Sequence, residues 1–134
     1  METNDPTRVF IVDDSAAMRV RLVDLLAPVP GVQIVGQAAS AETATAGILA
    51  LRPHTAVLDL NLGGTTGMQV IKAVRPFAPE VVFIVLTNHA EEPYRRACTA
   101  AGAAYFLDKS REFARVREII SHIAAVRAAR ELTP

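Results

Sequence analysis

Two kinds of hydrophobic pattern alternate along this chain. The first is a short run of apolar, mostly β-branched residues with little polar alternation. It occurs at residues 9–12, 32–35, 56–58, 81–86 and, more weakly, 103–107. Continuous runs of this length are typical of strands that are buried on both faces of a parallel sheet. We therefore expect five such strands.

The second pattern places apolar residues three and four positions apart, as amphipathic helices do. Segments of this kind follow each predicted strand, around residues 18–26, 41–51, 68–74, 92–101 and 113–126. Ser40 is a suitable N-cap and Gly102 a natural C-terminal glycine for two of these helices. Five rounds of strand then helix indicate an α/β fold, a doubly wound five-stranded parallel sheet in a three-layer α/β/α arrangement.

The composition fits one globular domain and narrows the class of protein. The 134 residues are 51% hydrophobic and 21% charged, and 14 basic residues balance 14 acidic ones. Direct binding of nucleic acid is not expected, because such domains need an excess of Lys and Arg. The single cysteine, Cys98, allows neither an intramolecular disulfide nor a cysteine cluster for zinc. We expect Cys98 to pack half-buried.

Targeting signals are not evident in the sequence. The first eight residues contain no apolar core, and no apolar run approaches the roughly 20 residues that a membrane span needs. We therefore expect a cytoplasmic protein that does not contact a membrane. Residues 1–7 and the last few residues are expected to be frayed.

The residues whose side chains could bind a ligand or react lie where the predicted strands end. Asp13 and Asp14 follow the first strand, Asp59 the third, Thr87 ends the fourth, and Lys109 follows the fifth. The carboxyl ends of parallel strands meet at one edge of the sheet, where such folds bind ligands. Three carboxylates, a hydroxyl and an ammonium should therefore converge there.

This set of groups suits phosphoryl transfer. Carboxylates brought close together repel one another, so a hard divalent cation such as Mg²⁺ (or Mn²⁺) with oxygen ligands would stabilise them. An Asp beside such an ion and a Lys can act as a nucleophile toward a phosphoryl group, which gives an aspartyl phosphate. Each residue also has a plainer interpretation: Asp14 and Thr87 as helix caps, Asp59 as part of a turn, Lys109 as a solvated charge. Their joint occurrence favours the functional interpretation.

The ordered set of segments resembles the receiver domain of two-component response regulators. The matching segments are Val-Phe-Ile-Val-Asp-Asp-Ser (9–15), Val-Leu-Asp-Leu-Asn-Leu (57–62), Gly67, Val-Leu-Thr (85–87), Gly102-Ala103 and Lys109. The resemblance implies a flavodoxin-like receiver fold like that of single-domain chemotaxis regulators. It places the receiver domain at residues 8–126, with terminal extensions at 1–7 and 127–134 and no output domain.

The resemblance implies a role for each matching residue. Asp59 would be the phosphorylated aspartate, Thr87 the switch hydroxyl, and Lys109 the lysine that pairs with the phosphoryl group. The aromatic switch position would be Phe106, which also suits the buried core. The Mg²⁺ site would consist of Asp13, Asp14, Asp59 and the backbone carbonyl of Asn61.

Three positions depart from the family pattern. Ser110 stands where a proline usually follows the lysine, Asn88 where a small residue usually follows the switch threonine, and Gly63 where a proline is frequent. None of these changes removes a chemical group, so we expect a working site with altered kinetics. Asn61, Asn88 and His89 are expected to tune those kinetics, and we interpret His89 as a solvated loop histidine rather than a general base.

The function implied is that of a signalling switch and not of an enzyme, apart from Mg²⁺-dependent self-phosphorylation and slow autodephosphorylation. A histidine kinase or histidine phosphotransfer protein would phosphorylate Asp59. The face formed by the fourth helix, fifth strand and fifth helix would then change for an unidentified protein target. We expect a monomer or a weak, phosphorylation-dependent dimer.

Three alternatives remain open. An aspartate-nucleophile phosphohydrolase would begin Asp-x-Asp-x-Thr, but Asn61 and Gly63 occupy the second and third of those positions. A degenerate receiver that acts without phosphorylation would not need the intact acidic set. The segment 30–36 resembles receivers fused to DNA-binding domains, so the chain could be the receiver half of a longer transcriptional regulator. We favour a stand-alone regulator.

Two further features receive plain interpretations. The segment Gly63–Gly67 lacks the Gly-Lys-Ser/Thr ending of a P-loop, so we interpret it as an ordinary loop. Arg95, Arg96 and the arginines of the last helix are interspersed with glutamates, and we interpret them as solvated faces.

Overall fold

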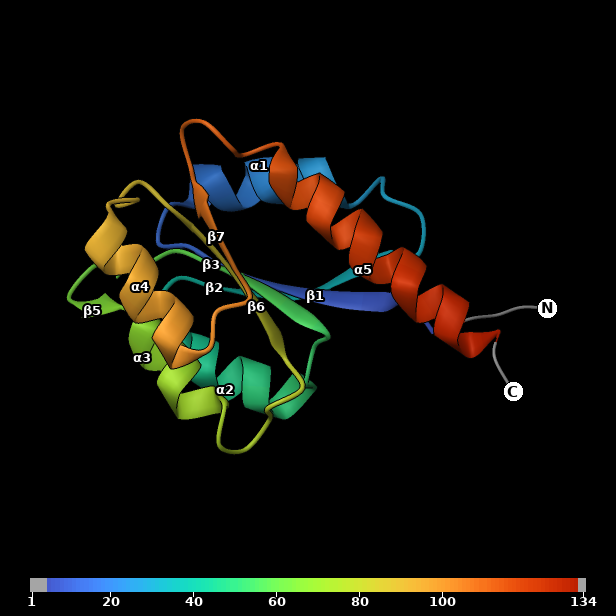
Figure 1. Cartoon of the computed structure of the whole chain (residues 1–134), viewed down its shortest axis with the longest axis horizontal. Helices are drawn as coiled ribbons and strands as arrows, with labels where there is room; N and C mark the ends of the chain where they lie inside the picture. Colours follow the sequence, from blue (N-terminus) through green and yellow to red (C-terminus); the bar gives the residue numbers. More distant parts are fainter. Residues whose placement is uncertain (1–4, 133–134) are drawn as a thin grey trace.

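A five-stranded parallel sheet forms the middle layer of the protein (Figure 1). The computed structural model describes residues 5–132. The strand order is β2-β1-β3-β6-β7, and all four pairings are parallel. The strands are β1 (Thr7–Val12), β2 (Val32–Ala38), β3 (Thr55–Leu58), β6 (Val82–Thr87) and β7 (Tyr105–Asp108). The predicted five-stranded parallel sheet is confirmed.

Helices cover both faces of the sheet, so the predicted three-layer arrangement is also confirmed. In Figure 1, α1 (Ala16–Leu26) and α5 (Arg115–Glu131) lie on one side, and α2 (Ala41–Leu51), α3 (Gly67–Val74) and α4 (Glu92–Ala101) lie on the other. Successive side chains of a strand point to opposite faces, which gives each face its own core. Val9 and Ile11 pack with α1 and α5, whereas Phe10 and Val12 pack with the cluster on the other side.

Local signals in the sequence locate several helix ends. Ser40 caps α2 by accepting the N–H of Thr43 at 3.2 Å. Gly102 ends α4 at a φ of 117°, a left-handed conformation that glycine adopts without a steric penalty. Cys98 in α4 is fully buried rather than half-buried as expected, and burial raises the pKa of its thiol.

All five strands differ from their predicted limits by one to three residues, and β1, β2 and β3 are longer than predicted. The fourth strand is Val82–Thr87 rather than 81–86, and the fifth is Tyr105–Asp108 rather than 103–107. The N–H of Ala103 bonds to the carbonyl of Cys98 at 2.9 Å, so this apolar residue closes the helix instead of extending the sheet. Apolar character alone does not distinguish these two roles.

A short hairpin forms after β3, where we expected an ordinary loop. β4 (Asn61–Leu62) and β5 (Thr65–Thr66) pair antiparallel across the two-residue turn Gly63-Gly64. Two-residue turns of this composition favour hairpins, which is why pairing forms here. The interpretation of this segment as an ordinary loop is therefore wrong.

The ends of the fold extend slightly beyond the predicted span of 8–126. Thr7 is buried in β1, so the fraying expected for the first seven residues does not reach it. Its hydroxyl accepts a hydrogen bond of 2.9 Å from Nη1 of Arg127, and α5 continues to Glu131. The remainder of the predicted extensions, residues 1–4 and 133–134, lies outside the described residues. Within residues 5–132, no helix is both long and apolar enough to cross a membrane.

Candidate functional site

The three predicted carboxylates meet at the carboxyl edge of the sheet. Asp13 and Asp14 follow β1, and Asp59 follows β3, its neighbour in the sheet. One ligand oxygen from each of the three lies within 4.8 Å of the others. Asp13 and Asp59 are buried, whereas Asp14 is exposed. The convergence expected from the strand ends is therefore present, and the group could hold one cation.

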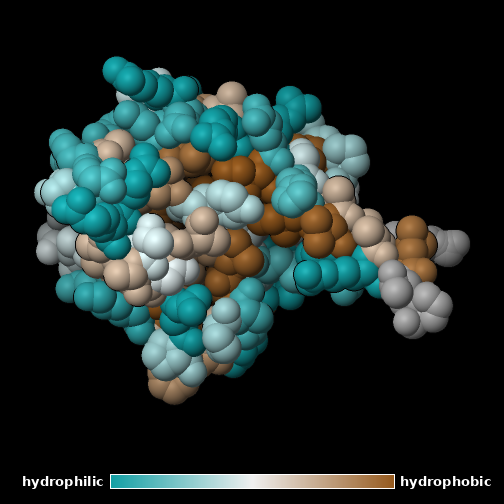
Figure 2. Space-filling view, viewed as in Figure 1, coloured by the Kyte–Doolittle hydropathy of each residue, from teal (hydrophilic) through white to brown (hydrophobic). Residues whose placement is uncertain are grey.

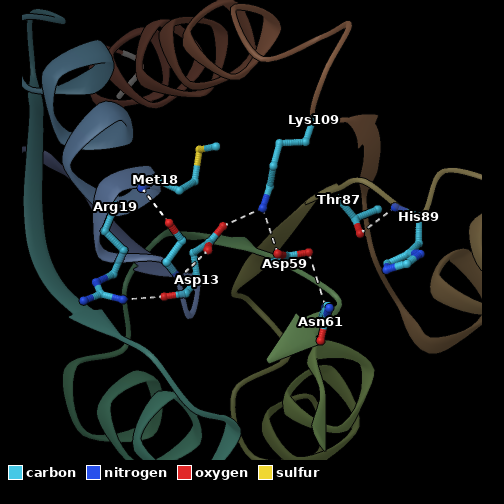
Figure 3. Close-up of polar contacts among 9 residues, drawn as sticks. Asp13, Met18, Arg19, Asp59, Asn61, Thr87, His89 and Lys109 are labelled. Carbon is cyan, nitrogen blue, oxygen red and sulfur yellow. Dashed lines mark hydrogen bonds and ion pairs between the residues drawn. The ribbon is translucent and has the colours of Figure 1, made fainter. Parts of the chain in front are cut away.

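Lys109 completes this cluster from the turn after β7 (Figure 3). Its Nζ donates hydrogen bonds of 2.8 Å to Oδ2 of Asp13 and 2.8 Å to Oδ2 of Asp59. Burial alone lowers the pKa of Lys109, but the hydrogen bonds and negative charges of the two aspartates outweigh it and raise the pKa. The side chain is 9% exposed, so its plain interpretation as a solvated charge is wrong.

The β1–α1 turn holds Asp13 in place. The N–H of Ser15 donates to Oδ1 of Asp13 at 2.9 Å, and Nη1 of Arg19 donates to the Asp13 backbone carbonyl at 2.6 Å (Figure 3). Ser15 also caps α1 by accepting the N–H of Met18 at 3.1 Å. The interpretation of Asp14 as the helix cap is therefore wrong. Arg19 was not predicted, because nothing in its sequence position distinguishes it from other polar helix residues.

The turn after β3 fixes the orientation of Asp59. The N–H of Asn61 donates to Oδ1 of Asp59 at 3.3 Å, while Oδ2 accepts from Lys109. Gly67, at the start of α3, packs so closely on the Asp59 carbonyl oxygen that a Cβ there would overlap it. Both carboxylate oxygens and the backbone of Asp59 are thus held from different sides.

Thr87 ends β6 at the margin of the same cluster and is fully buried. Its Oγ1 accepts the N–H of His89 at 3.1 Å, and its carbonyl accepts the N–H of Lys109 at 2.8 Å (Figure 3). Thr87 is not a helix cap, because α4 begins at Glu92 with Glu91 before it.

Two of the three residues expected to tune kinetics line one hollow beside this site. Asn61 and His89 both line a cavity of about 330 Å³ between the β4–β5 hairpin and the start of α4. The His89 ring lies 5.9 Å from the Tyr94 ring, centroid to centroid. Asn88 is exposed in the same turn, as is His89.

Phe106, the predicted switch ring, is buried in β7 with 7% of its surface exposed. Arg95 of α4 lies over it: the guanidinium carbon is 4.8 Å from the ring centroid, and Nη1 donates to the Phe106 carbonyl at 3.2 Å. The Arg95 side chain is also 43% exposed and its Nε lies 3.8 Å from Oε1 of Glu92, so Arg95 belongs to a solvated face as expected and contacts Phe106 as well. No sequence signal could have found this contact, because it joins a helix to a strand across a turn.

Ser110 organises the turn in place of the usual proline. Its N–H and its hydroxyl both donate to Oδ1 of Asp108, at 2.9 and 2.8 Å. The Asp108 N–H donates to Oε1 of Glu112 at 2.9 Å. The Ser110 hydroxyl and N–H lower the pKa of Asp108, and the Asp108 N–H followed by Arg115 lowers that of Glu112. This network holds the segment that carries Lys109.

Comparisons with known proteins place the chain in one family. Residues 9–121 match the family model of the response regulator receiver domain. The response regulator GacA of Pseudomonas protegens is 30% identical over 102 residues, covering 76% of this chain and 48% of that protein. The DNA-binding transcriptional activator DevR/DosR of Mycobacterium tuberculosis is 30% identical over 121 residues, covering 90% of this chain and 56% of that protein. The chain thus spans about half the length of these curated relatives.

Solved structures show the same relationship. The receiver domain of the response regulator NarL from Mycobacterium tuberculosis is 28% identical, with a TM-score of 0.83 over 91% of this chain and 98% of that one. A LuxR-family response regulator from Aurantimonas is 27% identical, with a TM-score of 0.83 over 90% of this chain and 86% of that one. Both the sequence and the fold therefore match one family over nearly the whole chain.

Proposed function

Because the chain belongs to the response regulator receiver domain family, we propose that it is a phosphorylation-dependent switch with Asp59 as the phosphoryl acceptor. One observation carries this proposal above the others. A single ammonium, Lys109 Nζ, bonds two buried carboxylates, Asp13 and Asp59, within a three-carboxylate cluster at the carboxyl edge of the sheet. Asp59 therefore lies where both a cation and an ammonium can neutralise a phosphoryl group.

The proposed step moves a phosphoryl group from a phosphohistidine of a histidine kinase or histidine phosphotransfer protein. A carboxylate oxygen of Asp59 forms a bond to phosphorus, the phosphorus–nitrogen bond breaks, and its electron pair stays on the imidazole nitrogen. The hydrogen bonds from Asn61 N–H and Lys109 hold the carboxylate in one orientation. The Lys109 ammonium also offsets negative charge on the transferring oxygens.

The donor set fits Mg²⁺ (or Mn²⁺) as the cofactor of this step. Hard divalent cations take carboxylate and carbonyl oxygens, and three carboxylates with ligand atoms within 4.8 Å supply them. We propose that Asp13, Asp14, Asp59 and the backbone carbonyl of Asn61 hold the ion. When bound, it supplies positive charge that stabilises the phosphoryl oxygens.

The response is proposed to pass through Thr87 and Phe106. The Thr87 hydroxyl can donate to an oxygen of the aspartyl phosphate, and the Phe106 ring lies inward in the core. Movement of the Thr87 turn would shift an equilibrium between inward and outward positions of that ring. The face of α4, β7 and α5 would change with it and be recognised by an unidentified protein target. We further propose that the domain acts as a monomer or a weak, phosphorylation-dependent dimer.

The lifetime of the aspartyl phosphate is proposed to depend on the residues around the neighbouring hollow. Asn61 and His89 line it from opposite sides, and Asn88 stands between His89 and the switch threonine. Their side chains control how water approaches the acyl phosphate. Cytoplasmic location and the absence of direct nucleic-acid binding stay predictions from the sequence.

A second candidate is the receiver half of a longer DNA-binding regulator. The matched region covers only 48% and 56% of these two curated relatives, and DevR/DosR is named a DNA-binding transcriptional activator. This observation favours the fused form over the stand-alone regulator that the sequence led us to expect. The coding sequence beyond codon 134 decides between them. The family match gives no support to the phosphohydrolase alternative.

Acetyl phosphate with Mg²⁺, followed by intact mass measurement, tests the phosphorylation proposal. The wild-type protein should gain about 80 daltons, and Asp59→Asn should gain nothing, because the nucleophile is absent. Asp24→Asn, at an exposed acid on α1, is the matched control and should behave as wild type. Excess EDTA should suppress the gain. An unmodified wild type, or an equal gain in Asp59→Asn, would contradict the proposal.

A further inference from the structure

A larger hollow lies at the opposite end of the sheet from Asp59. It is a cavity of about 590 Å³ between α5 and the segments that lead into β1, β3 and β6. Its basic lining residues are Arg8, Arg52, His54, His122, Arg127 and Arg130. Its apolar lining includes Val82, Ile123 and Val126. Figure 2 shows apolar surface (brown) along this side of α5, bordered by hydrophilic side chains (teal).

The charge of this cavity differs from that of the chain. Four of the 14 Lys and Arg residues line it, against one of the 14 Asp and Glu residues, Glu80. Glu80 is already paired with Arg52 at 2.9 Å. The chain as a whole has no net charge, so composition does not account for this concentration. A concave surface lined by one sign of charge concentrates ions of the other sign.

Two of the basic side chains that line the cavity have no partner in the described part of the chain. Arg8 donates to the Leu51 carbonyl at 2.6 Å, Arg52 pairs with Glu80, and Arg127 is held by Thr7 near Asp5 and Glu131. The side chains of Arg130 and His122 have no hydrogen bond or ion pair within residues 5–132. These two side chains stand on the wall of the cavity, on α5. The Arg130 guanidinium and the His122 ring therefore keep their hydrogen-bonding capacity for a ligand, as far as residues 5–132 are concerned.

His54 lies beside these arginines, and within residues 5–132 one of its ring nitrogens has no hydrogen-bond partner. Its Nδ1 accepts the N–H of Arg8 at 2.9 Å, so Nε2 carries the hydrogen of the neutral ring. Burial, followed by the charges of Arg127 and Arg8, lowers the pKa of His54, while Asp5 acts in the opposite direction. The ring is therefore a neutral donor beside guanidinium groups.

The backbone at Arg52 has an unusual conformation for a residue that lines this cavity. Arg52 ends α2 in the left-handed conformation, with φ 45° and ψ 62°, and within residues 5–132 it is the one residue other than glycine with positive φ. Glycine is the usual residue there because side chains destabilise this conformation. An arginine at this position lines the cavity in spite of that cost.

From these observations we propose that the cavity binds a small organic anion. The ligand would place a phosphate, sulfonate or carboxylate group against the arginines and an apolar body against Val82, Ile123 and Val126. Its volume is within the range of small-molecule sites. An acidic segment of another protein is the competing occupant, but an apolar floor beneath the cations suits a compact ligand better than a row of carboxylates. This site goes beyond the proposed function, since it shares no residue with the acidic cluster.

A pair of related probes tests the proposal. The anionic probe is 8-anilino-1-naphthalenesulfonate, and N-phenyl-1-naphthylamine is the same body without the sulfonate. Calorimetric titration should give one site for the anion with a Kd on the order of 10 µM, and binding of the uncharged analogue at least about tenfold weaker. Asp59→Asn should bind the anion as wild type does. Binding of the anion should therefore not depend on whether Asp59 is phosphorylated.

Two charge reversals on one helix separate this cavity from general charge effects. Arg130→Glu should weaken binding of the anion at least about tenfold, whereas Arg117→Glu, on α5 but outside the cavity, should leave it within about twofold. Both residues are exposed, so both variants should fold, which urea unfolding checks. NMR titration should also show that the bound anion raises the pKa of His54, because its charge offsets Arg8 and Arg127.

Several outcomes would overturn the proposal. One is that wild type does not bind the anion saturably. Another is that Arg130→Glu and Arg117→Glu bind the anion equally well. A third is that the charged and the uncharged probe bind wild type with equal affinity. A decaglutamate peptide that binds more tightly than the probe and displaces it would assign the cavity to an acidic protein segment instead. An unchanged His54 pKa in the bound state would place the anion elsewhere on the surface.

Discussion

Lys109 Nζ donates a hydrogen bond of 2.8 Å to Asp59, although the two residues are 50 positions apart and follow different strands. The same nitrogen bonds Asp13, so one ammonium faces two buried carboxylates. The third carboxylate, Asp14, has no hydrogen bond or ion pair within the described part of the chain. The cluster therefore retains negative charge that the protein itself does not neutralise, and folding must tolerate that repulsion.

Replacing Asp14 by Asn should stabilise the protein in EDTA, because it removes one of the repelling charges. Two unit charges about 4 Å apart in water interact by about 1 kcal/mol, which bounds the gain. The same change should abolish most of the stabilisation by Mg²⁺, because a ligand that binds only the folded state stabilises it in proportion to its affinity. Urea unfolding in EDTA and in saturating Mg²⁺ measures both effects. Asp24→Asn is the control, and an equal response to Mg²⁺ in wild type and Asp14→Asn would exclude Asp14 from the cation site.

The sequence predicted this convergence because it depends on two regular features only. Parallel strands end at a common edge, and polar residues after apolar runs mark those ends. The contacts of Arg95 and Arg19 could not be predicted in that way. A helix pattern separates a polar from an apolar face, but it does not say which polar side chain reaches a neighbouring carbonyl. The cavity at the other end of the sheet could not be predicted for the same reason, because its four arginines come from three separate segments.

Gly67→Ala should destabilise the fold and disturb the acceptor. A Cβ at this position would overlap the Asp59 carbonyl oxygen and lie 3.0 Å from Cγ of Leu58, so the turn that carries Asp59 must move. Overpacking of this kind costs about 1–3 kcal/mol. Urea unfolding gives the stability, and the rate of labelling by acetyl phosphate should fall in parallel.

Gly64→Ala is the matched control for that change. No heavy atom lies within 4 Å of a Cβ built at Gly64, and its φ is not positive. Its stability and labelling rate should therefore stay close to those of wild type. If both alanine variants lose the same stability, the close approach of Gly67 to Asp59 is not the cause.

Arg95→Ala should loosen the core around the proposed switch ring. The change removes the guanidinium 4.8 Å from the Phe106 ring and the hydrogen bond to its carbonyl. Together these contacts are worth about 1–2 kcal/mol at a half-buried position. Arg96→Ala, at an exposed neighbour without hydrogen bonds or ion pairs in the described chain, should cost much less. Unfolding measurements and the NMR shifts of the Phe106 ring distinguish the two variants, and equal losses would mean that the stacking contact contributes nothing.

Stability should fall in mild acid partly through His54. Its pKa in the folded protein is below the ordinary 6.5, mainly because of burial and then because of Arg127 and Arg8. The unfolded chain binds a proton at this histidine at a higher pH than the folded protein does. The stabilisation contributed by His54 is therefore fully present above pH 6.5. It declines as the pH falls toward the folded pKa. Below the folded pKa no further loss arises from this group.

The variant His54→Asn isolates this effect, because the Asn side-chain oxygen can still accept the Arg8 N–H and does not titrate. Urea unfolding at pH 7.5 and 5.5 should show a smaller acid-induced loss in His54→Asn than in wild type. His122→Asn, at an exposed histidine lining the same cavity, is the matched control for the removal of an imidazole. The carboxylates titrate alike in all three proteins, so their contribution cancels in the comparison. Identical losses in wild type and His54→Asn would show that the arginines do not bias this imidazole toward its neutral form.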